Sequence, residues 1–364
     1  MATLRQERPT RFSPDERPVR LGKGHYTKRD KDINTTGGAV RLRMGSDVRG
    51  LKGGSTPAVW FKAVRFHYVS PSFLPAILCS LVAWSSGYRP DIPGFLMVVI
   101  GVTVNHFGLN MLDDVCDYLH AVDRPETGER NPYTGGSGVL TEGLLRPKQL
   151  AAGAILCFVL TSVIGVYLAM TRGWPILALG LFGVFCSVFY TLPPIKFGYR
   201  GLGELGLLVN FGPVIGLGAY YVQTRTFAVE PFLVSLVLGV MMWSEIVINE
   251  IPDYEEDRSG GKMNLVARFG KKCGILLFVA GLVVAYAILA LTAFGGFAPT
   301  VLLAGLVSLP LAIKSVAILR KNYRQKLAMM PANLAMIEVH VLTGVAMIAA
   351  YVVYSLEKGI WKSF

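Results

Sequence analysis

Four polar residues share one predicted helix face at the end of an apolar stretch, and they are the first candidates for chemistry. The stretch closes with Asn110-Met-Leu-Asp113-Asp114-Val-Cys-Asp117, and Asp123 follows in the next loop. On a helix, residues at i, i+3, i+4 and i+7 lie on the same side. The spacing therefore predicts a cluster of carboxylates at one helix end.

A second acidic cluster closes another apolar stretch in the same way. It holds Asn249, Asp253 and Asp257, which recur every four residues and so face one direction on a helix. Pro252 lies inside this cluster, and a proline removes a backbone donor and crowds the preceding turn. We therefore expect the helix to loosen near Pro252.

Paired acidic clusters of this kind point to a divalent metal. Carboxylates that meet in a partly dry site repel each other and become protonated unless cations keep them ionised. Mg²⁺ prefers oxygen ligands and is usually bound through one or two carboxylates together with substrate phosphates. The plainer alternative is two charged helix ends at a lipid boundary, but the matching spacing of the two clusters favours the metal site.

The elements that must position these clusters are membrane-spanning helices. Of the 364 residues, 52% are hydrophobic and 16% are charged, which is more apolar length than a water-soluble core of this size can bury. Stretches of roughly 18 to 22 apolar residues are long enough to cross the hydrocarbon layer as helices. We predict an all-α integral membrane bundle of nine transmembrane helices, at residues 67–86, 94–112, 149–171, 174–192, 203–222, 230–250, 273–294, 298–318 and 335–355.

The distribution of basic residues predicts the orientation of this bundle. Cytoplasmic loops are enriched in Lys and Arg, and alternate loops fall on opposite sides of the membrane. With the N-terminus inside, only five of the 36 Lys and Arg residues lie outside, namely Arg89, Arg172, Arg225, Lys358 and Lys362. Both acidic clusters then emerge at the cytoplasmic face, and we expect a cell inner membrane location.

The first part of the chain differs in composition from the rest. Residues 1–60 are rich in basic and small residues, so we predict a largely disordered tail, followed by a transmembrane domain over residues 61–364. The tail suits contact with anionic lipid headgroups. The net charge of +12 reflects topology, and we do not expect nucleic-acid binding. The five cysteines stand singly, without metal-ligand spacing, and are expected to be free thiols.

Basic side chains in the predicted inner loops are candidates for binding a diphosphate. They are Arg130, Lys196, Arg258 and Lys262. Each can neutralise phosphate oxygens through charge-assisted hydrogen bonds. Each can also be read simply as a residue that marks the cytoplasmic side.

At the two acidic motifs the sequence resembles the UbiA superfamily of intramembrane aromatic prenyltransferases. The first motif of that family reads NDxxD followed by a further Asp, and two registers fit it here. Either Asn110 leads and Asp114 closes the motif, or Asp113-Asp114-Val-Cys-Asp117 matches with Asp in place of the leading Asn. The registers leave open which of Asn110 and Asp113 meets the metal.

The second family motif, DxxxD followed by a Gly-Lys pair, is matched by Asp253, Asp257, Gly261 and Lys262. The stretch GLGELGLLVNFGPVIGLGAYYVQT, residues 201–224, looks most similar to the 1,4-dihydroxy-2-naphthoate prenyltransferases of menaquinone synthesis. Pro193-Pro194-Ile-Lys196, in contrast, looks more like hydroxybenzoate and chlorophyll-type members. The resemblance thus spans roughly residues 60–355.

The resemblance implies Mg²⁺-dependent transfer of a polyprenyl group from its diphosphate to a lipophilic aromatic acceptor. It implies that Asp114, Asp117, Asp253 and Asp257 are catalytic and hold Mg²⁺, with further metal ligands among Asn110, Asp113 and Asn249. Metal and basic side chains stabilise the leaving diphosphate, and a dry, aromatic chamber protects the allylic cation from water. We expect acceptor contacts from Arg65, His106, Tyr190 and Glu245.

Two other interpretations stay open at the level of sequence. A secondary transporter also carries buried carboxylates, although its sites usually lie near the bilayer midplane and not at helix ends. Within the same fold, the acceptor could instead be 4-hydroxybenzoate, chlorophyllide, homogentisate, haem or an ether-lipid precursor, or there could be none, as in a terpene cyclase. Product analysis distinguishes these possibilities.

Overall fold

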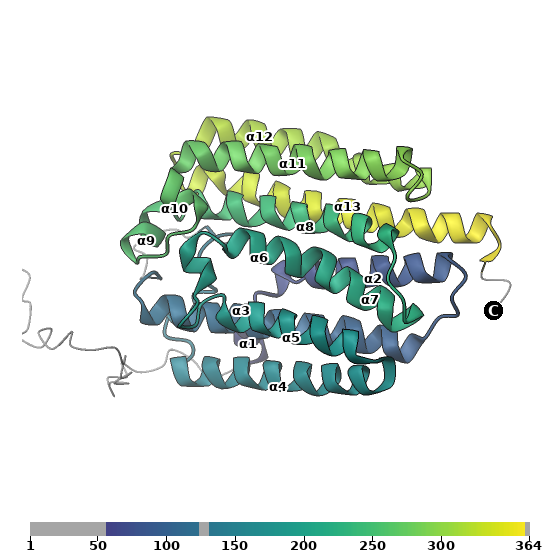
Figure 1. Ribbon diagram of the computed structural model, residues 1–364. Helices are drawn as coiled ribbons and strands as arrows, with labels where there is room; N and C mark the ends of the chain where they lie inside the picture. Colours follow the sequence, from purple (N-terminus) through teal and green to yellow (C-terminus); the bar gives the residue numbers. More distant parts are fainter. Residues whose placement is uncertain (1–55, 124–130, 361–364) are drawn as a thin grey trace, which may run out of the picture. The chain divides into compact units, whose positions relative to one another are not determined.

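The computed structural model describes residues 56–123 and 131–360, all of which belong to one compact unit. The predicted tail, residues 1–60, lies outside the described residues except for its last five positions, where the first helix already begins. The described chain is helical and contains no strand (Figure 1). Its helices are α1 Pro57–Ala63, α2 Ser70–Ser85, α3 Ile92–Leu119, α4 Pro147–Arg172, α5 Trp174–Phe189, α6 Gly203–Val209, α7 Ile215–Thr224, α8 Val229–Glu250, α9 Tyr254–Ser259, α10 Leu265–Phe269, α11 Lys271–Phe294, α12 Leu309–Asn322 and α13 Met330–Glu357.

Shorter helical turns join these helices. A π-turn over Asn210–Val214 makes α6 and α7 one continuous span, and the 3₁₀ segment Thr300–Ser308 extends α12. Two further 3₁₀ turns, Phe66–Tyr68 and Leu327–Met329, precede α2 and α13. Phe197–Arg200 forms a third such turn before α6.

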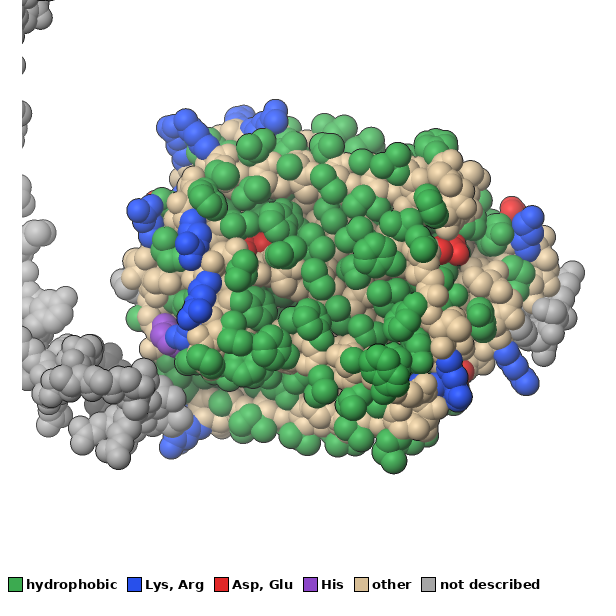
Figure 2. Space-filling view, in the orientation of Figure 1, with side chains coloured by type: hydrophobic (Ala, Val, Ile, Leu, Met, Phe, Trp, Pro, Cys, Tyr) green, Lys and Arg blue, Asp and Glu red, His purple; other side chains and the backbone are tan. Residues whose placement is uncertain are grey.

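Seven helices of the described chain are long and apolar enough to cross a membrane. The bent pair Pro57–Tyr68 and Ser70–Ser85 adds an eighth if it counts as one span, while Trp174–Phe189 is a shorter apolar helix. Each of the nine predicted segments thus coincides with a helix, but the count of nine crossings stays a prediction. Figure 2 shows hydrophobic side chains over the length of the bundle, with Lys and Arg gathered towards its ends, as a bilayer requires.

The bundle is layered around α8, which has the largest buried share of the spanning helices that the structure describes. It packs against α11, α13, α6 and α2. Where the π-turn crosses α8, a Cβ added to Gly212 would lie 2.7 Å from the Cα of Gly239, so the two backbones touch. Such close approach is typical of small residues at membrane helix interfaces.

At the outer edge of the bundle, α4 packs mainly against α3 (Figure 1). Of its 26 residues only Leu150, Ala154 and Leu168 are buried, so most of its surface faces outward. It is tied to the bundle by Thr161, whose hydroxyl donates to the carbonyl of Gly101.

The two acidic motifs end up at the same end of the bundle. α3 continues to Leu119, so the first motif lies on one helix, as predicted. α8 instead ends at Glu250, and α9 begins at Tyr254, which places the break around Pro252. The second motif therefore turns a corner, and its carboxylates reach the site from a loop and a short helix.

Candidate active site

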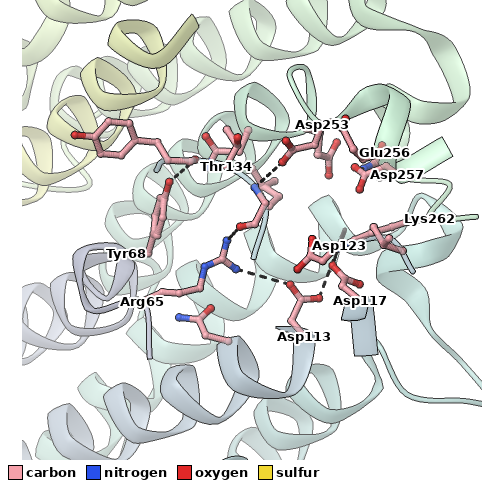
Figure 3. A pocket seen from close by; sticks show the side chains of 18 of the residues that line it. Arg65, Tyr68, Asp113, Asp117, Asp123, Thr134, Asp253, Glu256, Asp257 and Lys262 are labelled. Atoms are coloured by element: carbon pink, nitrogen blue, oxygen red, sulfur yellow. Dashed lines mark hydrogen bonds and ion pairs between the residues drawn. The ribbon is translucent and has the colours of Figure 1, made fainter. Parts of the chain in front are cut away.

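A cavity of about 750 Å³ lies between α3, α8 and the loops at this end of the bundle (Figure 3). Asp113, Asp117 and Asp123 lie on one side of it, and Asp253 and Asp257 lie on the other. Among the described lining residues nine are acidic and three are basic. The acids are Asp113, Asp117, Asp123, Glu142, Glu245, Glu250, Asp253, Glu256 and Asp257, and the bases are Arg65, Lys262 and Lys326.

Lys262 forms ion pairs with the first acidic cluster. Its Nζ lies 2.6 Å from Oδ2 of Asp117 and 3.6 Å from Oδ1 of Asp113. The other oxygen of Asp117 accepts a hydrogen bond of 2.5 Å from the hydroxyl of Tyr199. Although burial works against the charge, the carboxylates of Asp113, Asp117 and Asp257 raise the pKa of Lys262 well above its usual range. The ammonium group therefore stays charged among the carboxylates.

The second cluster is held by a different set of partners. Oδ2 of Asp253 accepts from the backbone N–H of Gly135 at 2.6 Å, and its Oδ1 lies 3.5 Å from Nζ of Lys326. Asp257 accepts from the side-chain amide of Asn264 at 2.7 Å. These contacts fix both carboxylates so that they face Asp113 and Asp117 across the cavity.

The acidic side chains outside the spans are electrostatically strained without added cations. Burial raises the pKa of Asp123 to about 6, and the neighbouring Asp117 adds to the shift. Burial also raises the pKa of Asp253, and that of Asp257 well above its usual range. A bound cation would relieve this strain by favouring the ionised carboxylates.

Asp114 plays a different part from its neighbours. It does not line the cavity, and its two oxygens accept from the backbone N–H of Ser137 at 3.1 and 2.9 Å. Residues 131–137 therefore form a strap that joins Asp114 on α3 to Asp253 beyond α8. Arg65 donates to the carbonyl of Gly135, which holds the strap from a third side.

The strap brings glycine backbone against the first acidic cluster. A Cβ added to Gly136 would overlap Oδ2 of Asp123 and lie 2.8 Å from Oδ1 of Asp114. Sequence reasoning overlooked this segment, although the run Gly135-Gly136-Ser137-Gly138 was the available signal, since glycine permits close backbone approach.

We expect Gly136→Ala to lower the rate of prenyl transfer by about 10²-fold, because displacing reacting groups by about 1 Å costs that much. Turnover in membranes and thermal unfolding in detergent measure the effect. Gly165→Ala, where an added Cβ meets no atom within 4 Å, is the control. Equal activity of the two variants would contradict the role given to the strap.

The four predicted acceptor residues, Arg65, His106, Tyr190 and Glu245, all line the same cavity. His106 lies 2.6 Å from the hydroxyl of Ser72 and packs on Phe211, with ring centroids 4.6 Å apart. Tyr190 is buried at the edge of the cavity, and Glu245 lies on α8 one turn before Asn249. His106 and Phe211 thus give the cavity an aromatic wall between α3 and the Asn210–Val214 turn.

The two predicted asparagines both line the cavity and both also hold the helices together. Asn110 donates to the carbonyl of Val64 at 3.0 Å, which ties α3 to the end of α1. Asn249 accepts from the side chain of Asn333 at 2.9 Å, which ties α8 to α13.

Two predicted diphosphate-binding residues are not brought to the cavity. Lys196 lies 2.7 Å from Nε2 of His120, and Arg258 is exposed and donates to the hydroxyl of Tyr254. Arg130 lies outside the described residues. Lys326 takes a place that sequence reasoning did not give it, because it reaches the cavity from the turn before α13.

The donor set fits a divalent cation shared with a substrate. Within the described chain, no group of three or more His, Cys, Asp or Glu side chains is placed to hold a metal ion by itself. Oδ1 of Asp113 and Oδ1 of Asp253, however, are buried and accept no hydrogen bond. Mg²⁺ commonly binds one or two carboxylates and completes its shell with phosphate and water. The site therefore suits Mg²⁺ that arrives with a diphosphate.

The comparison with protein families agrees with this geometry. The UbiA prenyltransferase family matches residues 72–337, which is most of the chain. The chain belongs to the UbiA prenyltransferase family. It is therefore a prenyltransferase and a multi-pass membrane protein, and the resemblance seen in its two acidic motifs is confirmed.

Individual relatives are distant. The chain is 25% identical over 228 residues to the 1,4-dihydroxy-2-naphthoate octaprenyltransferase of Bacillus subtilis, which covers 63% of this chain and 71% of that protein. It is 28% identical over 301 residues to the 2-carboxy-1,4-naphthoquinone phytyltransferase of Synechocystis, which covers 82% and 94%. Both relatives act on naphthalene-type acceptors according to their names.

Solved structures share the fold. A UbiA homologue from Aeropyrum pernix, in its apo state, matches with a TM-score of 0.57 and 15% identity, over 76% of this chain and 97% of that one. A UbiA homologue from Archaeoglobus fulgidus, bound to DMAPP and Mg²⁺, matches with a TM-score of 0.54 and 10% identity, over 80% and 99%. At these identities the likeness establishes the fold.

Proposed function

We propose that this UbiA-family enzyme transfers a polyprenyl group from its diphosphate to 1,4-dihydroxy-2-naphthoate, in a Mg²⁺-dependent step of menaquinone synthesis. The observation that carries the proposal is the single cavity with two parts. Carboxylates and Lys262 surround its mouth, and aromatic and apolar side chains surround its deeper part. Such a cavity suits the diphosphate of the donor at the mouth and the ring of the acceptor in the deeper part.

The mouth is built to receive the donor's diphosphate. Asp113 and Asp117 on one side and Asp253 and Asp257 on the other would hold Mg²⁺, which supplies Lewis-acid stabilisation of the leaving diphosphate. Lys262 and Lys326 can donate charge-assisted hydrogen bonds to phosphate oxygens. They are already in the cavity, within 4 Å of carboxylates that they would share with the metal.

The deeper part is built to exclude water from the reacting carbon. Phe211, Leu207 and Met242 line it, and His106 packs against Phe211 with the two ring planes tilted by 60°. An aromatic face stabilises a cation that develops within about 6 Å. A dry chamber also prevents capture of the allylic cation by water.

The naphthoate acceptor is supported by the names of the relatives and by the segment over residues 201–224. Arg65 is placed to bind an acceptor carboxylate, because it lines the cavity between its two parts and already neutralises Asp113 and Asp114, each 3.9 Å away. We further propose that the cavity opens to the cytoplasm and that the protein resides in the cell inner membrane. Lys and Arg are in excess in the loops on the side of the acidic motifs, as is typical of cytoplasmic loops.

Product analysis tests the proposal. Membranes that contain the protein are supplied with Mg²⁺, a polyprenyl diphosphate and either 1,4-dihydroxy-2-naphthoate, 4-hydroxybenzoate or homogentisate, with EDTA as the control. Mass spectrometry should find a prenylated, decarboxylated naphthol that disappears with EDTA. A product from another acceptor would overturn the naphthoate assignment, and the absence of any diphosphate release would overturn the proposed use of a diphosphate donor.

A further inference from the structure

A buried acid and a buried imidazole form a pair beneath the deeper part of the cavity. Glu245 on α8 is 2% exposed and His340 on α13 is 0% exposed. Nδ1 of His340 lies 2.7 Å from Oε2 of Glu245, across the interface of the two helices. Glu245 lines the cavity, whereas His340 lies behind it. The two residues are 95 positions apart, so only the packing of α8 on α13 reveals their partnership.

The unpartnered nitrogen of His340 indicates where the shared proton lies. Nε2 of His340 is buried and has no hydrogen-bond partner. If His340 donates through Nδ1–H, the neutral ring leaves Nε2 as an unused acceptor. If Glu245 were protonated and donated instead, Nε2–H would be a buried donor without an acceptor, and such orphaned donors are costly. The arrangement therefore favours a hydrogen bond that Nδ1–H of His340 donates to Oε2 of Glu245.

A carboxyl group buried this deeply in a spanning helix points to a functional role. Isolated buried charges are strongly unfavourable, and charged residues within spanning helices usually mark functional sites. Tyr68, His106, Phe211 and Met242 line the same cavity as Glu245. The ring centroids of His106 and Phe211 lie 4.6 Å apart, so the cavity offers aromatic surface to a flat acceptor ring as well as a carboxylate.

We propose that Glu245 accepts a hydrogen bond and then a proton from the hydroxyl group of a phenolic acceptor, and that His340 positions Glu245 for this step. The inference rests on the proposed function and adds the two residues that handle the hydroxyl proton of its acceptor. Glu245 is the catalytic residue because it touches the acceptor. His340 is a positioning residue because it acts through Glu245.

The proposed step conserves every proton and electron pair. As the ring carbon beside the hydroxyl bonds to C1 of the donor, the C1–O bond breaks and its electron pair leaves with the diphosphate. The O–H proton passes to Glu245, and the ring oxygen becomes a ketone. A ring carbon that carries hydrogen then loses its C–H proton to the released diphosphate, whereas a ring carbon that carries a carboxylate, as in the naphthoate, loses CO2. In either case the electron pair of the broken bond restores the aromatic ring, and Glu245 returns its proton to the oxygen.

The matched variants are Glu245→Gln and Glu338→Gln. Glu338 lies on the exposed face of α13, two residues before His340, so it controls for the loss of a carboxylate from a helix. Glu245→Gln keeps the shape and can still hydrogen-bond, but it cannot take a proton. We expect Glu245→Gln to lower kcat by about 10²-fold or more with an unchanged KM for the donor, as is usual when a general base is lost. Glu338→Gln should leave kcat unchanged.

A modified acceptor separates proton transfer from structure. The probe is an acceptor in which the hydroxyl beside the reacting ring carbon is methylated, so that it has no proton to give to Glu245. With this acceptor, wild type and Glu245→Gln should be equally slow. The substitution His340→Asn keeps a hydrogen-bond donor near the position of Nδ1, whereas His340→Leu removes it. We expect His340→Asn to keep most of kcat and His340→Leu to lose about 10-fold, with melting temperatures measured in detergent for each.

The outcomes distinguish this inference from the proposed function. If wild type transfers no prenyl group to any phenolic acceptor, the proposed function fails. If wild type is active and Glu245→Gln matches it with the unmodified acceptor, the inference about Glu245 is overturned while the function stands. If His340→Leu and His340→Asn have equal kcat, the positioning role of His340 is overturned.

Discussion

Asp253→Asn should lower the rate of Mg²⁺-dependent prenyl transfer by about 10²–10³-fold, which corresponds to the several kcal/mol of charge stabilisation that a metal ion supplies. Asp253 offers a buried Oδ1 that accepts no hydrogen bond, and an amide at this position binds Mg²⁺ poorly. The asparagine oxygen can still accept from the N–H of Gly135, so the strap over residues 131–137 should stay in place. Initial rates across a Mg²⁺ titration measure the effect.

The control for this substitution is Glu255→Gln, which removes an exposed carboxylate two residues further along the chain. It should retain wild-type activity. A wild-type rate for Asp253→Asn at limiting Mg²⁺ would remove the second acidic cluster from the mechanism. Melting temperatures of the two variants in detergent would show whether a lower rate reflects lost folding.

Lys262→Met should raise KM for the donor and lower kcat, with a combined loss of about 10²-fold in kcat/KM. Among the residues that the structure describes, the ammonium of Lys262 is the cation nearest to Asp117, at 2.6 Å. Methionine would remove both the contact with the diphosphate and the neutralisation of the acidic cluster. Lys196→Met is the control, because Lys196 pairs with His120 outside the cavity.

A second readout of Lys262→Met does not depend on turnover. In the resting protein Lys262 occupies the space between Asp113 and Asp117 that a metal would share. Without donor, we therefore expect Lys262→Met to bind Mn²⁺ more tightly than wild type, as followed by electron paramagnetic resonance of free Mn²⁺. Weaker Mn²⁺ binding by the variant would show that Lys262 does not compete with the metal.

The regular parts of the site were predictable from spacing. α3 runs past Leu119, so the face that carries Asn110, Asp113 and Asp117 is an ordinary helical face, and these residues line the cavity as expected. Asp114, one position beyond Asp113, points instead to the strap. A spacing rule of i, i+3 and i+4 is too coarse to separate neighbours on the edge of a helix face.

The second motif shows how a correct expectation can have the wrong geometry. Asn249, Asp253 and Asp257 do line one cavity, but α8 ends at Glu250, so they do not share one helix. Pro252 signalled the break, whereas the direction that the chain takes after it depends on the contact of Asp257 with Asn264 and on that of Asp253 with Lys326, which lies far along the sequence.

Loop residues could not be placed from sequence. Lys196 and Lys326 both follow apolar segments on the same predicted side, and nothing in their neighbours distinguishes them. In the structure Lys196 lies over the ring of Tyr199, while Lys326 turns into the cavity through the Leu327–Met329 turn. Tertiary contacts decide which loop cation reaches a site, and a single sequence does not contain them in readable form.

The sparse packing of α4 has a consequence for handling the protein. With Leu150, Ala154 and Leu168 as its only buried side chains, α4 takes most of its surroundings from lipid tails and few from other helices. When the protein is extracted, detergent therefore replaces a larger part of the surroundings of α4 than of those of α8. Because α4 covers α3, the bearer of the first acidic motif, assays in liposomes or nanodiscs preserve the support of that motif better than micelles do.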